Sequence, residues 1–217
     1  MKTETEGETG KPRRGVPHWP GSIALLVIGA IYLLVSSQIT LGPSWLPIVL
    51  VIGLVVGLAI MRRAGDPRRT HGLALAAVGV MTLLVVGSAA FLVLRLLDGG
   101  TRAPALLRDA ALVWIVNVLT FALWYWEIDA GGPAERRRDH HTSTDFIFPQ
   151  MTLPDATARQ WSPNFLDYLF LSFNTSTAFS PTDTLVLSRR VKVLMMLQAL
   201  LSLIVIAVLA ARAVNTL

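Results

Sequence analysis

The fold class is decided by the stretch Gly72-Leu-Ala-Leu-Ala-Ala-Val-Gly-Val-Met-Thr-Leu-Leu-Val-Val-Gly-Ser-Ala-Ala-Phe-Leu-Val-Leu-Arg-Leu-Leu97. Among these 26 residues only Arg95 carries a charge. A helix needs about 20 apolar residues to cross the hydrocarbon core of a bilayer. In lipid the backbone must form its hydrogen bonds within the protein, which a helix does along its own length. The stretch therefore predicts a transmembrane helix.

Four further apolar runs flank this stretch, at residues 21–41, 43–61, 104–126 and 190–212. Hydrophobic residues make up 53% of the chain. Charged residues make up 15%, against about a quarter in soluble domains. The chain has no cysteine, which excludes disulfides and thiolate chemistry. We predict an all-α fold, a polytopic transmembrane helical bundle with five spans.

A shorter segment, residues 164–180, begins apolar and ends in hydroxyls and an amide. We expect a helix near 164–178 that crosses the membrane, re-enters it or lies at its surface. The predicted organisation has four parts: a disordered cytoplasmic tail (1–20), a four-helix transmembrane region (21–126), a polar loop (127–163), and a short pore-like helix followed by the final transmembrane helix (164–217). The first apolar run is interpreted as a retained span and not a cleaved signal.

Positive charges cluster between the apolar runs, as the positive-inside rule describes. With a cytoplasmic N-terminus, 13 Lys and Arg lie inside and 6 outside if the 164–180 segment crosses. The numbers become 15 and 4 if that segment re-enters. We therefore expect a multi-pass protein of the bacterial plasma (inner) membrane with its N-terminus in the cytoplasm. The net charge of +5 then sets orientation, so the expected partner is the lipid bilayer and not nucleic acid.

Polar side chains inside the predicted spans are candidate functional groups because burying them in lipid is costly. Asn117 and Thr120 lie deep in the fourth run, and Gln198 lies deep in the last one. Two interpretations stay open, namely interhelical hydrogen bonds and the lining of a hydrated path. The candidate polar path comprises Asn117, Thr120, Asp167, Asn174, Thr175, Ser176, Thr177 and Gln198.

The residues after this short helix lead into the last span. Ser188 is placed to cap a helix that begins with Arg189 and Arg190. Asp183 is a candidate for a structural ion pair with Arg189 or Arg190.

Three stretches carry a resemblance to a known family: Tyr168-Leu-Phe-Leu-Ser-Phe173, Thr177-Ala-Phe-Ser-Pro-Thr-Asp183 and the Ser-Arg-Arg start of the following helix. Together they resemble the C-terminal signature of a family of small bacterial integral membrane proteins of unknown function. The resemblance covers residues 164–217 most specifically and the whole chain by hydropathy. It implies a bundle of several helices and supplies no activity.

The same region is distantly similar to the pore helix, filter and inner helix of two-span potassium-channel pore domains. An aromatic helix leads into Thr175-Ser-Thr-Ala-Phe-Ser180, then Asp183 and a long apolar helix. Potassium filters use glycines so that backbone carbonyls face the ion. Ala178 and Ser180 stand where those glycines would fall, which argues against potassium selectivity and leaves a modified pore or solute path.

Signals for catalysis are weak. Asp139, His140, His141 and Asp145 could bind a metal, but a solvated polar loop is the favoured interpretation. An intramembrane hydrolase would need Ser172 or Ser176 near one of those histidines. We therefore expect no enzymatic activity, no metal and no cofactor.

Two functions stay open for the chain. The first is channel-like or transporter-like permeation of ions or small solutes, and the second is a non-catalytic structural or partner-binding subunit. Gly53 and Gly57 form a G-x-x-x-G pair that suits either a homo-oligomer or packing within one bundle.

Overall fold

The computed structural model describes residues 19–37, 39–40, 42–43, 45–98, 103–137, 144–154, 161–177 and 183–214. Its long helices are α1 (Trp19–Leu34), α2 (Leu46–Arg63), α3 (Pro67–Asp98), α4 (Ala103–Ile128) and α7 (Arg189–Val214), with the shorter α6 (Phe165–Thr177) before the last. The remaining elements are η1 (Asp129–Gly131), η2 (Glu135–Arg137), β1 (Phe146–Ile147), η3 (Pro149–Thr152) and β2 (Leu185–Val186). The predicted tail lies outside the described residues except for its last two.

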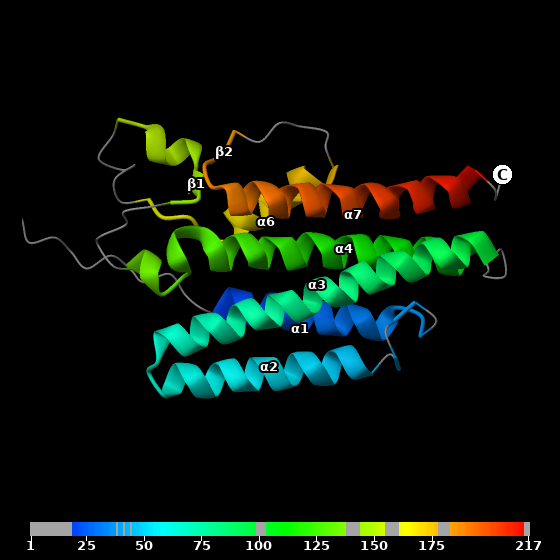
Figure 1. Ribbon diagram of the computed structural model, residues 1–217, viewed down its shortest axis with the longest axis horizontal. Helices are drawn as coiled ribbons and strands as arrows, with labels where there is room; N and C mark the ends of the chain where they lie inside the picture. Colours follow the sequence, from blue (N-terminus) through cyan, green and yellow to red (C-terminus); the bar gives the residue numbers. More distant parts are fainter. Residues whose placement is uncertain are drawn as a thin grey trace, which may run out of the picture.

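Helix α4 is the centre of the bundle. It packs against α1, α3, α6 and α7, while α2 lies outermost against α1 and α3 (Figure 1). Its buried side chains, Val113, Val116 and Phe121 among them, meet apolar residues from the surrounding helices. The outer faces of the other helices expose large apolar side chains, for example Ile52, Leu83 and Leu203, as expected where lipid is the solvent.

The predicted all-α membrane bundle is confirmed, but five spans are not. Four helices are long and apolar enough to cross a membrane: α2, α3, α4 and α7. Helix α1 has 16 residues, about 24 Å at 1.5 Å per residue, which is shorter than a hydrocarbon core of about 30 Å. Helix α6 has 13 residues and is shorter still.

The segments before and after α6 lie at the same end of the bundle. Strand β1, which precedes α6, pairs antiparallel with β2, which follows it, so that Phe146 lies opposite Val186. Helices α6 and α7 consequently start side by side (Figure 1). We call this end the basic end, because it holds the α2–α3 turn, the segment after α4 and the start of α7, with Arg62, Arg68, Arg136 and Arg190 among their residues.

Local capping explains several helix boundaries. Ser188 Oγ accepts a hydrogen bond from the Val191 N–H at 3.4 Å, which confirms the predicted cap of α7. Asp66 Oδ1 accepts one from the Arg69 N–H at 3.1 Å and starts α3. Between α2 and α3, Gly65 adopts a φ of +74°, a conformation that favours glycine.

Because α6 and α7 start at the same end of the bundle, we can predict from which side of the membrane introduced cysteines are labelled. The chain has no native cysteine, so there is no background labelling. Single cysteines at residues 65, 153 and 183 should react with a membrane-impermeant thiol reagent from the same side, because all three positions lie at the basic end. A cysteine at residue 42, in the α1–α2 connection, should react from the opposite side. Labelling of residue 183 from the same side as residue 42 would contradict the described topology.

Candidate functional site

The amide of Gln198 on α7 is the centre of a polar cluster buried between three helices. Its Nε2 lies 2.8 Å from the Ser172 carbonyl oxygen, 2.7 Å from Ser172 Oγ and 2.6 Å from Ser176 Oγ, all on α6. Its Oε1 accepts a hydrogen bond from the Tyr125 hydroxyl of α4 at 2.5 Å. The Ser172 hydroxyl donates in turn to the Val118 carbonyl oxygen at 2.7 Å. One amide thus joins α4, α6 and α7.

Asn117 and Ser202 extend the cluster one turn further. Asn117 Nδ2 donates to Ser202 Oγ at 2.8 Å, and both side chains are buried. Asn117 Oδ1 is buried without a hydrogen-bond partner in the described part of the chain, as is Thr120 Oγ1. We define the polar seam as this cluster on α4, α6 and α7: Asn117, Tyr125, Ser172, Ser176, Gln198 and Ser202. Thr120 lies beside it on α4 and makes none of its hydrogen bonds.

The end of α6 lies at mid-depth in the bundle. The Phe173 ring packs edge-on against Trp114, near the middle of α4, with 5.8 Å between ring centroids. Thr175 Oγ1 donates to the Leu171 carbonyl at 2.9 Å, and Thr177 Oγ1 lies 3.2 Å from the Phe173 carbonyl. These two hydroxyls are therefore satisfied along their own helix. Asn174, half-buried, takes no part in the seam.

Asp167 is a capping residue rather than part of the path to which we assigned it. Its Oδ2 accepts a hydrogen bond from the Asn164 N–H at 2.7 Å, and Asn164 Oδ1 accepts one from the Leu166 N–H at 2.8 Å. This reciprocal pairing satisfies backbone donors at the start of α6. The physical reason is position, since Asp167 lies in the first turn of α6, at the basic end, where its carboxylate accepts from the Asn164 N–H and not from a seam side chain.

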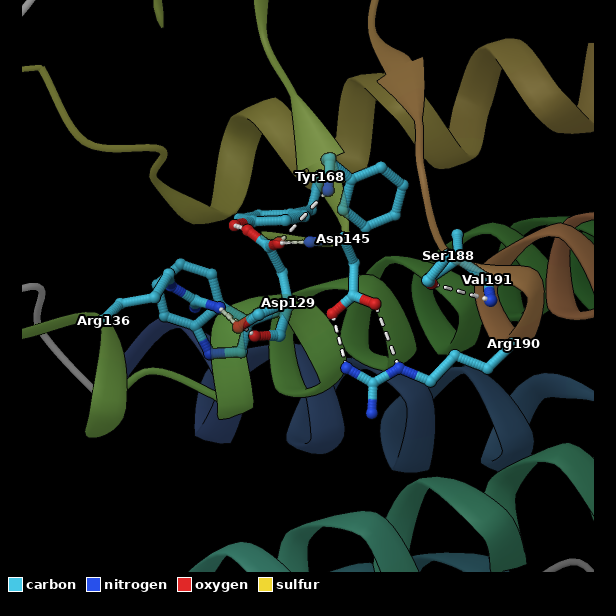
Figure 2. Close-up of polar contacts among 9 residues, drawn as sticks. Asp129, Arg136, Asp145, Tyr168, Ser188, Arg190 and Val191 are labelled. Atoms are coloured by element: carbon cyan, nitrogen blue, oxygen red, sulfur yellow. Dashed lines mark hydrogen bonds and ion pairs between the residues drawn. The ribbon is translucent and has the colours of Figure 1, made fainter. Parts of the chain in front are cut away.

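A second polar cluster lies at the basic end, where α4 stops (Figure 2). Asp129 is buried, with 1% of its surface exposed. Its Oδ1 accepts a hydrogen bond from the Asp145 N–H at 2.9 Å, and its Oδ2 accepts one from the Tyr168 hydroxyl at 2.5 Å. The carboxylate therefore ties the end of α4 to β1 and to the first turns of α6.

Arg136 closes the same end from the other side. Its Nη1 donates to the carbonyl oxygens of Trp126 at 2.8 Å and Asp129 at 2.7 Å, which are acceptors left free where the helix ends. Its guanidinium also lies over the Trp126 ring, 4.6 Å from the centroid, and near the Tyr168 ring. A buried arginine is tolerated here because carbonyls and aromatic faces replace its water.

Asp145 holds the start of α7. Its two carboxylate oxygens accept hydrogen bonds from Arg190 Nε at 3.0 Å and Nη2 at 2.6 Å, a bidentate pair (Figure 2). This corrects our expectation of an ion pair between Asp183 and Arg189 or Arg190. Among the described residues Asp183 makes no ion pair and is exposed. Strand pairing brings Asp145 beside Arg190, a tertiary contact between residues 45 positions apart.

The environment of Asp145 shifts its pKa. Burial of the carboxyl would raise the pKa, but hydrogen bonds from Arg190 and Ser188 and the charge of Arg190 outweigh burial, and the pKa lies below its ordinary value. The carboxylate is thus the form that the folded protein prefers.

The proposed catalytic groupings gain no support from the described structure. Ser172 and Ser176 both contact Gln198, and the histidines that a hydrolase would need, His140 and His141, lie outside the described residues together with Asp139. Within the described part of the chain no group of three or more His, Asp or Glu residues could hold a metal ion.

Sequence reasoning missed Asp129, Arg136 and Tyr125. The available signal was weak: an acid directly after an aromatic span end, then two glycines and an Arg-rich stretch. Nothing in the spacing of these residues indicates that all three side chains are buried.

Replacing Asp145 by asparagine should lower the free energy of unfolding by about 2 kcal/mol, because Arg190 loses its bidentate acceptor beside a buried group. Asp183→Asn is the matched control and should change stability by less than about 0.5 kcal/mol. Denaturant titration of the purified protein in detergent measures both. Equal effects of the two substitutions would contradict the assignment of the ion pair to Asp145.

Acid should remove the contribution of the Asp145–Arg190 ion pair to the free energy of unfolding. A carboxyl whose pKa is lowered on folding stabilises the protein fully above its ordinary pKa of about 4, and this stabilisation is lost as the pH falls through the lowered value. The stability difference between the wild-type protein and Asp145→Asn should therefore be constant near neutral pH and shrink below about pH 4. A difference that grows on acidification would overturn the stated direction of the shift.

Comparisons of the chain with models of protein families, with curated proteins and with solved structures found no match.

Proposed function

We propose that this protein is a channel-like or transporter-like membrane protein that passes ions or small solutes along the α4–α6–α7 seam. The observation that carries the proposal is the half-length helix α6, which starts at the basic end and stops at mid-depth beside a buried set of amides and hydroxyls.

A helix that stops inside the membrane needs a reason. At about 20 Å, α6 is too short to cross, and its last carbonyls must find partners in protein or water. Discontinuous helices of this kind form substrate sites near the bilayer midplane in transporters. The hydroxyls of Ser172 and Ser176 and the amide of Gln198 supply both donors and acceptors at that depth.

The described structure suits a closed state of such a path. The seam side chains are between 0% and 3% exposed, and they bind one another. Neither of the two cavities that we describe, one at the basic end and one between α1, α4 and α6, is lined by seam residues. Opening would require the α6 hydroxyls to exchange Gln198 for water or solute.

The arrangement of charge supports a re-entrant α6 with the basic end in the cytoplasm. When α6 enters and leaves on one side, 15 Lys and Arg fall on the basic side and 4 on the other. Helix α1, antiparallel to α2 (Figure 1), is taken as a fifth crossing in this proposal. The N-terminus is then cytoplasmic, and the membrane is the bacterial plasma membrane to which the sequence resemblance points.

A structural or partner-binding subunit is the rival function. One observation favours it. Both the oxygen and the nitrogen of the Gln198 amide already have hydrogen-bond partners in the protein, so they need no solute to satisfy them. The rival predicts that the seam only holds the helices together.

Purified protein reconstituted into vesicles distinguishes the two functions. We expect flux of ions or of small polar solutes above that of empty vesicles, measured with a potential-sensitive dye and by light scattering after an osmotic step. Gln198→Leu keeps the size of the side chain and removes its polar groups, so it should reduce the flux at least tenfold if solute must exchange hydrogen bonds there.

The matched control is Thr82→Val on α3, which removes a 2.8 Å hydrogen bond from Trp124 elsewhere in the bundle. It should keep wild-type flux. No flux from correctly folded wild-type protein, or equal flux in the wild type and Gln198→Leu, would sink the proposal and favour the rival.

A further inference from the structure

A cavity of about 360 Å³ lies at the basic end, apart from the polar seam. The α2–α3 turn forms one wall, with Arg62, Asp66 and His71, and the end of α4 with the loop after it forms the other, with Glu127 and Pro133. Its volume is within the range of small-ligand sites. Charged side chains of both signs, the cation Arg62 and the anions Asp66 and Glu127, therefore line one pocket.

Glu127 is the unusual group in this cavity. Only 7% of the residue is exposed, and its described polar partner is His71, with 3.6 Å between His71 Nδ1 and Glu127 Oε2. That distance is beyond a good hydrogen bond. A buried carboxylate normally has several donors. Glu127 thus lines the cavity with acceptor capacity to spare.

Arg62 presents the complementary charge. Its Nη1 donates to Ser22 Oγ on α1 at 3.0 Å, and its Nε is buried without a hydrogen-bond partner among the described residues. Among the described residues it forms no ion pair: Asp66 lies 3.2 Å from Arg69, and Glu127 lies 3.6 Å from His71. The guanidinium therefore lines the cavity without a direct ion-pair partner among the described residues.

The loop after α4 lies directly against His71 at Gly132. Gly132 has a φ of +95°, and a Cβ there would lie 2.8 Å from His71 Nδ1 and 3.1 Å from the Glu127 carbonyl oxygen. Only glycine permits both this conformation and this approach. The cavity is thus bounded by backbone that holds His71 beside Glu127.

We propose that this cavity binds the headgroup of a phospholipid whose phosphate contacts Arg62 and whose ammonium contacts Glu127, that is, a phosphoethanolamine headgroup. Arg62 has no ion-pair partner among the described residues, and the described polar contact of Glu127 is His71 at 3.6 Å, so the cavity suits a ligand with both signs. The cavity lies where α2 ends in Arg62 and Arg63, the usual level of headgroups, and Trp19 at the same end is 62% exposed, as interfacial tryptophans are. Ile60, 59% exposed on α2, offers a lipid-facing surface for an acyl chain.

Native mass spectrometry of the full chain in detergent can count bound lipids and test the assignment. Phosphatidylethanolamine should bind the wild type roughly tenfold more tightly than phosphatidylcholine, whose methylated ammonium cannot donate hydrogen bonds to Glu127. Glu127→Gln should abolish this preference. Arg62→Gln should weaken both lipids, and Arg63→Gln, an exposed neighbour that does not line the cavity, should behave as the wild type.

Equal binding of the two lipids by the wild type would overturn the proposal, and this comparison needs no variant to fold. Retention of the preference in Glu127→Gln would also overturn it. Soluble phosphoethanolamine separates a lipid from a free zwitterion. Displacement of bound phosphatidylethanolamine by millimolar phosphoethanolamine would identify a free solute as the ligand, and its failure to compete would support the lipid.

Discussion

The hydrogen bonds of the Gln198 side chain fix the short helix α6 against α4 and α7, a position that helix packing alone does not determine. Between membrane helices lipid provides little hydrophobic driving force, so packing and interhelical hydrogen bonds decide which surfaces meet. Helix α6 is too short to be positioned by length alone. Its register on α4 and α7 is set by Ser172 and Ser176, which both meet the Gln198 amide, and by Ser172 again at the Val118 carbonyl.

The basic end provides the second constraint. Helix α6 and helix α7 start at the same end of the bundle, and two aspartates hold the segments that flank α6 at that end. Asp129 fastens the segment before α6 to the end of α4, and Asp145 fastens the same segment to the start of α7. Because Asp129 also accepts from Tyr168, one carboxylate fixes the entry of the chain and the first turns of α6 together.

Hydropathy was sufficient to predict a helical membrane bundle, since four of the five predicted runs correspond to helices long enough to span. It overestimated α1, because the apolar residues after Leu34 do not continue the helix. The depth of Asn117 and Gln198 inside the apolar runs identified both as residues to examine. The partners could not be predicted, because the bonds from Tyr125 to Gln198 and from Arg190 to Asp145 join residues 73 and 45 positions apart. The mistaken choice of Asp183 shows why: proximity along the chain favoured it, whereas strand pairing placed Asp145 nearer.

Buried ionisable side chains and buried uncharged polar side chains occupy different depths of the bundle. This difference determines which groups a solute in the seam would contact. The buried ionisable groups lie toward the two ends of the bundle, where water and headgroups limit the cost of burial: Glu127, Asp129, Arg136 and Asp145 at the basic end and Asp109 at the opposite end, where it accepts a hydrogen bond from the Ser36 N–H. The mid-depth seam contains only amides and hydroxyls. A dehydrated ion there would find dipoles but no countercharge, whereas an uncharged polar molecule could replace the Gln198 hydrogen bonds one for one. For the permeation path that we propose along the seam, this chemistry suits uncharged polar solutes better than bare ions.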